Sequence, residues 1–147
     1  MNDTVYDKQH GLYLEDIEMG MSAVFAKTLT EADVLMFAGV SGDTNPLHIN
    51  AEFAEQTRFN QRIVHGMLTT SLWSTIVGTQ LPGPGCAYMG QDINFLKPVY
   101  IGSTVTAKLT VNRVDAEKQR VYLDAEAHVG ETLVANGETK VWVPKRS

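Results

Sequence analysis

The feature that most constrains the fold is a switch of hydrophobic period across residues 81–85, Leu-Pro-Gly-Pro-Gly. Before this breaker, residues 65–79 carry apolar side chains at helical spacing on nearly every side, and such a helix is usually buried. After it, apolar and polar residues alternate through 104–112 and again through 120–129. This alternation is typical of antiparallel strands with one solvated face. The sequence therefore predicts an α+β architecture in which a sheet covers one long helix.

The remaining elements follow from local signals. A strand is expected within 13–27, broken around Gly20, and two more over 87–96 and 133–143. Thr30 and Asp33 are spaced as in a capping box, so a helix is predicted over 31–40. Residues 41–61 are expected to form a loop with a short helix near 51–57. Residues 1–12 are expected to be an irregular polar N-terminal extension, and residues 13–147 a single domain.

A single sheet around one helix leaves an edge strand unpaired and one end of the helix poorly covered. The pairing of two subunits edge to edge would remove both problems. We therefore expect a homodimer or a higher homo-oligomer.

Charge and composition exclude several classes of partner. The net charge of -5 argues against nucleic acid and against a polybasic membrane-binding surface, while a local basic pocket for a phosphate-bearing ligand stays compatible with it. No apolar run is long enough to span a bilayer, and the N-terminus lacks the pattern of a signal peptide. Cys86 is the only cysteine, which favours a reducing compartment, so we expect a cytoplasmic protein. The four histidines show no close metal-ligand spacing, and no metal site is expected.

The segment 37–48 carries the first candidate for chemistry. Asp43 and His48 are separated by five positions across an Asn-Pro pair. Pro46 fixes its own φ and keeps Asn45 out of the helical region, and Gly42 can adopt a left-handed conformation. Such a loop can aim a carboxylate and an imidazole at one point, which suffices to deprotonate a water and protonate a carbon. The alternative is an ordinary turn with a capping aspartate and a surface histidine.

The second candidate is the start of the long helix at residues 63–68. The first amides of a helix lack partners within it and carry the positive end of the dipole. Gly66 has no side chain to shield its amide, so a thioester carbonyl could be polarised there. Alternatively, Gly66 is small because another backbone packs on it, and His65 has a structural or a catalytic role.

Residues 37–54 resemble the signature of the MaoC-like dehydratases, the R-specific enoyl-CoA hydratases. The resemblance rests on Phe37, Val40-Ser41-Gly42-Asp43, Asn45-Pro46-Leu47-His48 and Ala54. Residues 63–68 and 91–102 resemble two further blocks of that family, so the resemblance covers residues 14–143. Two departures are an N-terminal extension and Arg62, where many relatives have proline.

The resemblance implies a hot-dog fold and a dimer with the CoA tunnel at its interface. It implies that Asp43 and His48 form the catalytic pair and that Gly66 donates its amide to the thioester oxygen. Ser74 resembles the family's active-site serine, and Asn45 a residue that shapes the loop and touches the site. The implied reaction is reversible hydration of a trans-2-enoyl-CoA to the (R)-3-hydroxyacyl-CoA, with no metal or redox cofactor. The acyl group, the pathway and the carrier, CoA or acyl carrier protein, stay open.

Two other functions compete with this one. A hot-dog thioesterase would direct a carboxylate at the carbonyl carbon, and a non-enzymatic acyl-CoA-binding module would need neither group. The joint presence of Asp43 and His48 in one short loop disfavours both.

Bulky side chains suggest a shallow acyl tunnel. Trp73 and Met67 belong to the long helix, and Tyr88 and Phe95 to the strand expected to face it. A close-packed tunnel end resists extra methylenes, so a preference for chains of about four to six carbons is expected. In the alternative, Trp73 belongs to the ordinary core.

Overall fold

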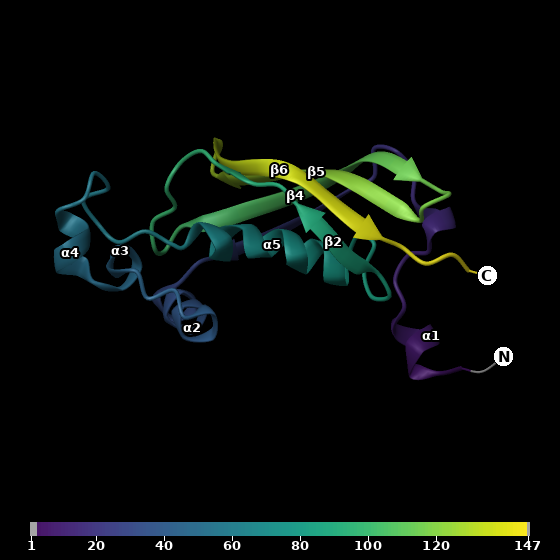
Figure 1. Ribbon diagram of the computed structural model, residues 1–147, viewed down its shortest axis with the longest axis horizontal. Helices are drawn as coiled ribbons and strands as arrows, with labels where there is room; N and C mark the ends of the chain where they lie inside the picture. Colours follow the sequence, from purple (N-terminus) through teal and green to yellow (C-terminus); the bar gives the residue numbers. More distant parts are fainter. Residues whose placement is uncertain (1–2, 147) are drawn as a thin grey trace.

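The computed structural model describes residues 3–146 and contains one antiparallel sheet (Figure 1). Its strands are β1 (Ser22–Thr28), β2 (Ala87–Gln91), β3 (Asn94–Phe95), β4 (Thr104–Asp115), β5 (Arg120–Val129) and β6 (Thr132–Trp142). Their spatial order is β1-β4-β5-β6-β2, and β3 also pairs with β6. The strands predicted over 104–112, 120–129 and 133–143 are confirmed, whereas the strand predicted over 87–96 is divided into β2 and β3.

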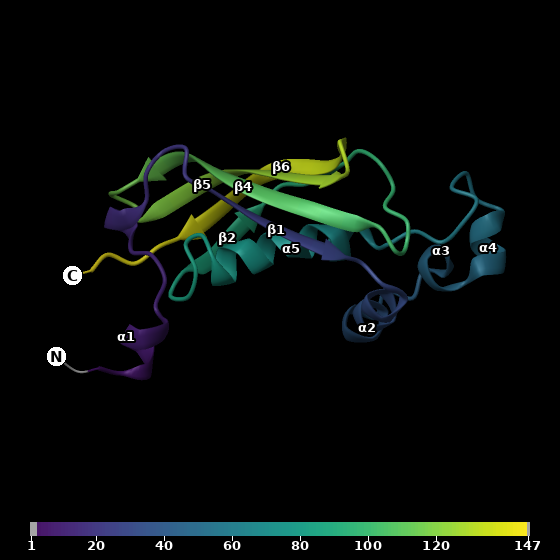
Figure 2. The ribbon, with the colours of Figure 1, turned by 180° about the vertical axis from the view of Figure 1, so that it is seen from behind.

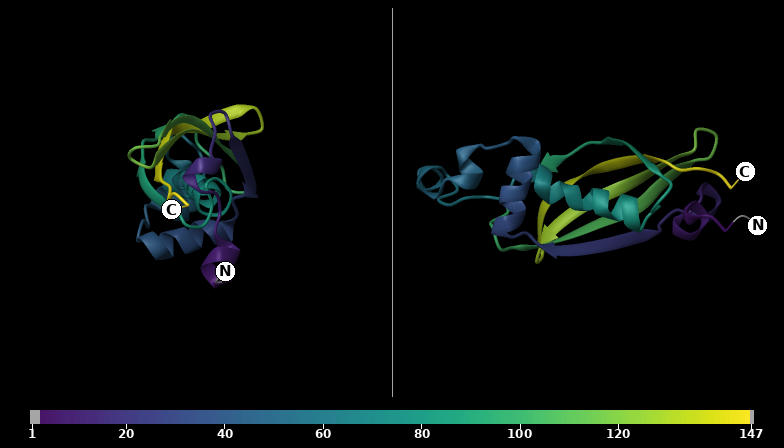
Figure 3. Two further views of the ribbon diagram at one scale, coloured as in Figure 1. Left: turned by 90° about the vertical axis from the view of Figure 1, so that its right-hand side faces the viewer. Right: turned by 90° about the horizontal axis from the view of Figure 1, so that it is seen from below.

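The sheet curls around the long helix α5 (Gly66–Thr79), as the end-on view of Figure 3 shows. Inward-facing residues of β4 alternate with outward ones, so that Val105, Ala107 and Leu109 are fully buried. Trp73 and Ile76 of α5 are also fully buried. This confirms the predicted α+β architecture.

One stripe of α5 is exposed in the described chain, although apolar residues lie on nearly every side of the helix. Met67 is 57% exposed, and Ser74 and Gly78 are exposed as well. These residues fall on one stripe of the helix because side chains three, four and seven positions apart share a face. A single curved sheet covers only part of a cylinder, which leaves this stripe open.

Three helices extend beyond one end of the sheet (Figures 1 and 2). They are α2 (Glu31–Ser41), α3 (Pro46–Ile49) and α4 (Ala51–Glu55). The capping box is confirmed, since Thr30 and Asp33 exchange hydrogen bonds at the start of α2. Gly42 ends α2 with φ +79°, the left-handed conformation that favours glycine. This turn directs the chain away from the sheet and into the loop that holds Asp43.

The prediction of an irregular N-terminus is wrong. Residues Val5–Gln9 form a helix, α1, because Thr4 and Asp7 make a second capping box. A 3-10 turn, η1 (Leu14–Asp16), follows, so β1 begins later than the predicted strand. The division into an extension over 1–12 and a domain over 13–147 stays a prediction, and residues 1, 2 and 147 lie outside the described residues.

The segments around Leu14 and Pro144 lie side by side at the far end of the sheet from α2, α3 and α4 (Figure 1). The Leu14 amide donates to the Pro144 carbonyl over 2.9 Å. Arg146 forms an ion pair with Asp16, whose closest N–O distance is 2.7 Å.

Candidate active site

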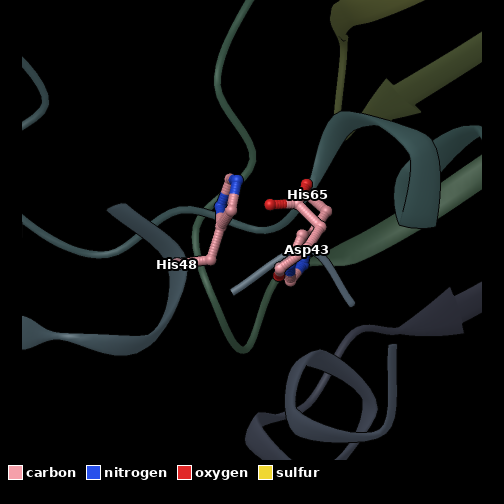
Figure 4. Close-up of side chains that lie close together, drawn as sticks. All are labelled: Asp43, His48 and His65. Carbon is pink, nitrogen blue, oxygen red and sulfur yellow. The ribbon is translucent and has the colours of Figure 1, made fainter. Parts of the chain in front are cut away.

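Three polar side chains meet at the N-terminus of α5 (Figure 4). Asp43 follows the last turn of α2, His48 belongs to α3, and His65 directly precedes α5. One carboxylate oxygen of Asp43 and one ring nitrogen of each histidine, the atom types that can bind a metal ion, all lie within 4.8 Å of one another. The loop therefore brings the carboxylate and the imidazole together, as the sequence indicates, and adds a second imidazole to them.

The loop between them is shaped by Asn45. Its side-chain oxygen accepts a hydrogen bond from the Leu47 amide over 3.0 Å, while Pro46 starts α3. The Asp43 carboxylate in turn accepts from the Asn45 amide over 3.2 Å. Asn45 thus fixes the geometry between Asp43 and His48, and its contact with substrate stays a prediction.

The protonation pattern of His48 follows from its surroundings. Its Nδ1 lies 2.7 Å from the Ile63 carbonyl oxygen, which can only accept, so Nδ1 carries the hydrogen and Nε2 keeps its lone pair. Burial lowers the pKa of His48, against the raising effects of the Ile63 hydrogen bond and the charge of Asp43. A neutral imidazole with one free lone pair can act as a base near neutral pH.

His65 links the members of this cluster. It is 1% exposed, and its Nε2 donates to the Asp43 carbonyl over 2.9 Å. Its ring stacks on the His48 ring with centroids 3.9 Å apart and lies 4.8 Å from the centroid of Phe37. His65 therefore holds both predicted catalytic residues. The sequence contained no signal for this contact beyond the position of His65 next to the helix start.

Gly66 is the first residue of α5, so its amide has no acceptor within the helix. A Cβ at this position would lie 2.6 Å from the Phe95 ring. Packing therefore requires a small residue here, although the neighbour is a side chain and not the backbone that the alternative expected, and this packing is compatible with an accessible amide.

A pocket of about 300 Å³ opens beside Gly66. Its lining is largely apolar, with Phe59, Val64, Met67, Phe95, Leu96 and Val134, and also includes Asp43 and His65. Arg58 and Lys97 are the cationic side chains of this lining. The pocket therefore offers a small apolar space whose polar lining consists mainly of Asp43, His65 and the positively charged Arg58 and Lys97.

Several residues singled out by the sequence are not among those that line this pocket, including His48, Asn45, Ser74 and Trp73. Ser74 is on the exposed stripe of α5 and is not among the lining residues. Trp73 is fully buried, and its Nε1 donates to the Glu126 carbonyl over 2.9 Å. The interpretation of Trp73 as a tunnel end is therefore wrong, because its ring fills the space between α5 and the sheet. Of the four bulky residues, Met67 and Phe95 line the pocket, and Tyr88 does not.

A curved antiparallel sheet around a central helix, with a carboxylate and an imidazole of lowered pKa at the start of that helix, defines a hot-dog protein equipped for acid–base chemistry. The chain belongs to the MaoC-like family, since the family model described as "MaoC like domain" matches residues 14–132.

Curated relatives match nearly the whole chain. An (R)-specific enoyl-CoA hydratase from Rhodospirillum rubrum is 47% identical over 91% of this chain and 93% of its own length. A 3-hydroxybutyryl-CoA dehydratase from Methylorubrum extorquens is 42% identical over 92% of this chain and 86% of its own length.

Solved structures agree with this assignment. An (R)-hydratase from A. caviae, described as involved in PHA biosynthesis, superposes with a TM-score of 0.85 at 40% identity, covering 88% of this chain and 99% of the other. An R-hydratase from Pseudomonas aeruginosa gives 0.87 at 34% identity, covering 94% and 89%. The hot-dog fold is therefore confirmed. Within residues 3–146, no helix combines the length and hydropathy needed to cross a bilayer.

Proposed function

We propose that this protein is an (R)-specific enoyl-CoA hydratase, which reversibly hydrates trans-2-enoyl-CoA to (R)-3-hydroxyacyl-CoA. The observation that carries the proposal is the geometry of His48, whose Nδ1 contacts the Ile63 carbonyl and which lies beside the Asp43 carboxylate at the N-terminus of the helix that begins with Gly66. The names of the similar hydratases and dehydratase support it.

The chemistry adds one water across the C2–C3 double bond. Asp43 and His48 hold the water, and His48 Nε2 takes one of its protons while the oxygen bonds to C3. The electron pair of the double bond moves toward the thioester oxygen, which accepts a hydrogen bond from the Gly66 amide. His48 then returns the proton to C2, so the enzyme ends in its starting state. No electron is gained or lost, and the proposal requires neither a metal nor a redox cofactor.

The substrate is proposed to enter beside Arg58 and Lys97. These cations line the pocket of a protein whose net charge is -5, and they suit the phosphate groups of coenzyme A. The apolar lining around Met67 and Phe95 suits the acyl chain. The proposed partner is therefore an acyl thioester, and neither nucleic acid nor a membrane is proposed as a partner. The proposed compartment is the cytoplasm.

A homodimer would complete the site. The exposed stripe of α5 runs from Met67, which lines the pocket, to Ser74. These positions are seven residues apart, or about 10 Å along the helix. A second subunit lying over this stripe would turn it into a tunnel wall, and this would bring Ser74 to the acyl chain.

The test is an assay with crotonyl-CoA and longer trans-2-enoyl-CoAs, in buffer with and without EDTA. Loss of enoyl absorbance with formation of the (R)-3-hydroxy product in both buffers is expected. Parallel measurement of free thiol separates the alternatives, because a thioesterase would release CoA and a hydratase would not. Binding of enoyl-CoA with neither reaction would identify a binding module and refute the proposal.

A further inference from the structure

We propose that Arg62 is a positioning residue, which fixes the backbone of His48 through a hydrogen bond while Glu31 of α2 holds its guanidinium group. The catalytic consequence rests on the proposed hydratase function, whereas the structural consequence does not.

The contacts of Arg62 join three segments of the chain. Its Nε donates to the His48 carbonyl over 2.7 Å. Its Nη1 donates to Glu31 Oε2 over 2.9 Å, and its Nη2 lies 2.9 Å from Glu31 Oε1. Only 18% of the Arg62 side chain is exposed. The side chain thus connects the start of α2, the helix α3 and the segment before α5.

The next residue, Ile63, makes two further hydrogen bonds to His48 and its neighbour Leu47. The Ile63 carbonyl accepts from His48 Nδ1, and the Ile63 amide donates to the Leu47 carbonyl over 3.4 Å. Residues 62 and 63 therefore hold the imidazole ring of His48 from one side and its backbone from another. A shift of this backbone would move Nε2 relative to Asp43.

The His48 carbonyl needs such a donor because α3 has only four residues. In so short a helix the Asn50 amide reaches the Pro46 carbonyl, and the later carbonyls, His48 among them, lie in the last turn beyond the reach of a helical amide. A cation near these carbonyls is also favoured by the helix dipole. The planar guanidinium group of arginine can donate to two separate acceptors at once, and here Nε serves the His48 carbonyl while the Nη atoms face Glu31. The single ammonium group of lysine lacks this fork.

The charge of Arg62 also bears on His48. Burial is the main cause that lowers the pKa of His48, and the charges of His65 and, to the smallest extent, Arg62 lower it further, whereas the Ile63 hydrogen bond and the charge of Asp43 raise it. Glu31 partly offsets Arg62, but it is the more exposed partner, with 52% of its side chain accessible. Removal of Arg62 is therefore expected to raise the pKa of His48.

The variants Arg62→Met, Arg62→Lys and Arg146→Met test the proposal. Methionine keeps an unbranched, flexible side chain, though a shorter one, and donates no hydrogen bond, so kcat for crotonyl-CoA should fall roughly 10- to 100-fold with KM changed less than about 3-fold. Lysine should restore part of kcat. Arg146 forms an ion pair with Asp16 away from the site, so Arg146→Met should lose a similar ion pair and keep wild-type kcat.

A measurement without substrate separates this proposal from the proposed function. The ring signals of His48, assigned by their loss in His48→Asn, are followed by NMR against pH in the wild type and in Arg62→Met. A higher pKa of His48 in Arg62→Met is expected even if the protein hydrates no enoyl-CoA. The proposal would be overturned if the His48 ring signals of Arg62→Met matched the wild type in both chemical shift and titration, if its kcat stayed within about 2-fold of the wild type, or if Arg146→Met showed an equal loss.

Discussion

At the scale of single residues, one backbone carbonyl decides which nitrogen of His48 is available. Ile63 accepts from Nδ1, so the lone pair lies on Nε2 without any need for a carboxylate at the rear of the ring. In the proposed mechanism this leaves Asp43 free to hold the water, because it is not required to orient the imidazole.

The first prediction concerns this pair. Asp43→Asn and His48→Asn should each lower kcat by roughly 10²- to 10⁴-fold, because each removes a proton-transfer group with little change in shape. Steady-state kinetics with crotonyl-CoA measures the loss, and circular dichroism checks that the fold is intact. A folded variant with near-native activity would show that the assignment is wrong.

The second prediction concerns pH. The pKa of His48 is lowered from its ordinary value of 6.5, so the neutral base should predominate above pH 6.5. We expect kcat/KM for hydration to fall only as the pH drops below 6.5. The charge of Asp43 raises this pKa, and Asp43→Asn should therefore move the acid limb of its residual activity to lower pH. An acid limb above pH 6.5 in the wild type would contradict this assignment.

At the scale of elements, the start of α5 combines a helix terminus with a close contact. The Phe95 ring lies where a side chain at residue 66 would be, so the strand β3 approaches the proposed thioester site directly.

The third prediction follows from that contact. Gly66→Ala should push the Phe95 ring into the pocket and lower kcat/KM by roughly 10-fold or more, the equivalent of about 1.4 kcal/mol. A matched control is Gly39→Ala in α2, where an added Cβ meets nothing within 4 Å. Equal effects of the two substitutions on kcat/KM would refute a special role for Gly66.

The elements also show how far the sequence could lead. Periodicity located α5, β4 and β5 because these elements have ten or more residues over which the apolar positions repeat. The helix α1 was missed because a capping box begins only five residues with no apolar period. At the site, the Asn45-Pro46 loop was readable from its turn residues. The contacts of His65 and Arg62 were not, because they depend on segments 14 to 31 positions apart in sequence.

At the scale of the whole molecule, the described protomer leaves apolar surface open. Met67, Phe95 and Leu96 are about half exposed beside the pocket, and Tyr88 and Met89 on the edge strand β2 are also exposed. Exposed edge strands and contiguous apolar patches commonly mark interfaces.

The fourth prediction is therefore a homodimer at least, with sheets joined edge to edge. Light scattering on the purified protein should give a mass of twice 16.2 kDa or more. A stable and active monomer of 16.2 kDa would exclude this assembly.

The fifth prediction concerns acyl-chain length. The pocket of about 300 Å³ should favour chains of about four to six carbons, because a packed lining resists extra methylenes. Met67→Ala should shift kcat/KM toward longer chains. Trp73→Ala should leave the chain-length profile unchanged and cost roughly 3–5 kcal/mol of unfolding free energy, since its ring belongs to the core. A wild-type preference for chains of eight to twelve carbons would defeat this prediction.

The contact between Leu14 and Pro144 has a practical consequence for immobilisation. Both ends of the described chain lie at the opposite end of the sheet from the helices that carry the Asp43 loop (Figure 1). A short linker to a solid support or to a carrier protein, attached at either end, would therefore leave the pocket facing solution. The proximity of residues 14 and 144 also suits circular permutation, because a few added residues could join them.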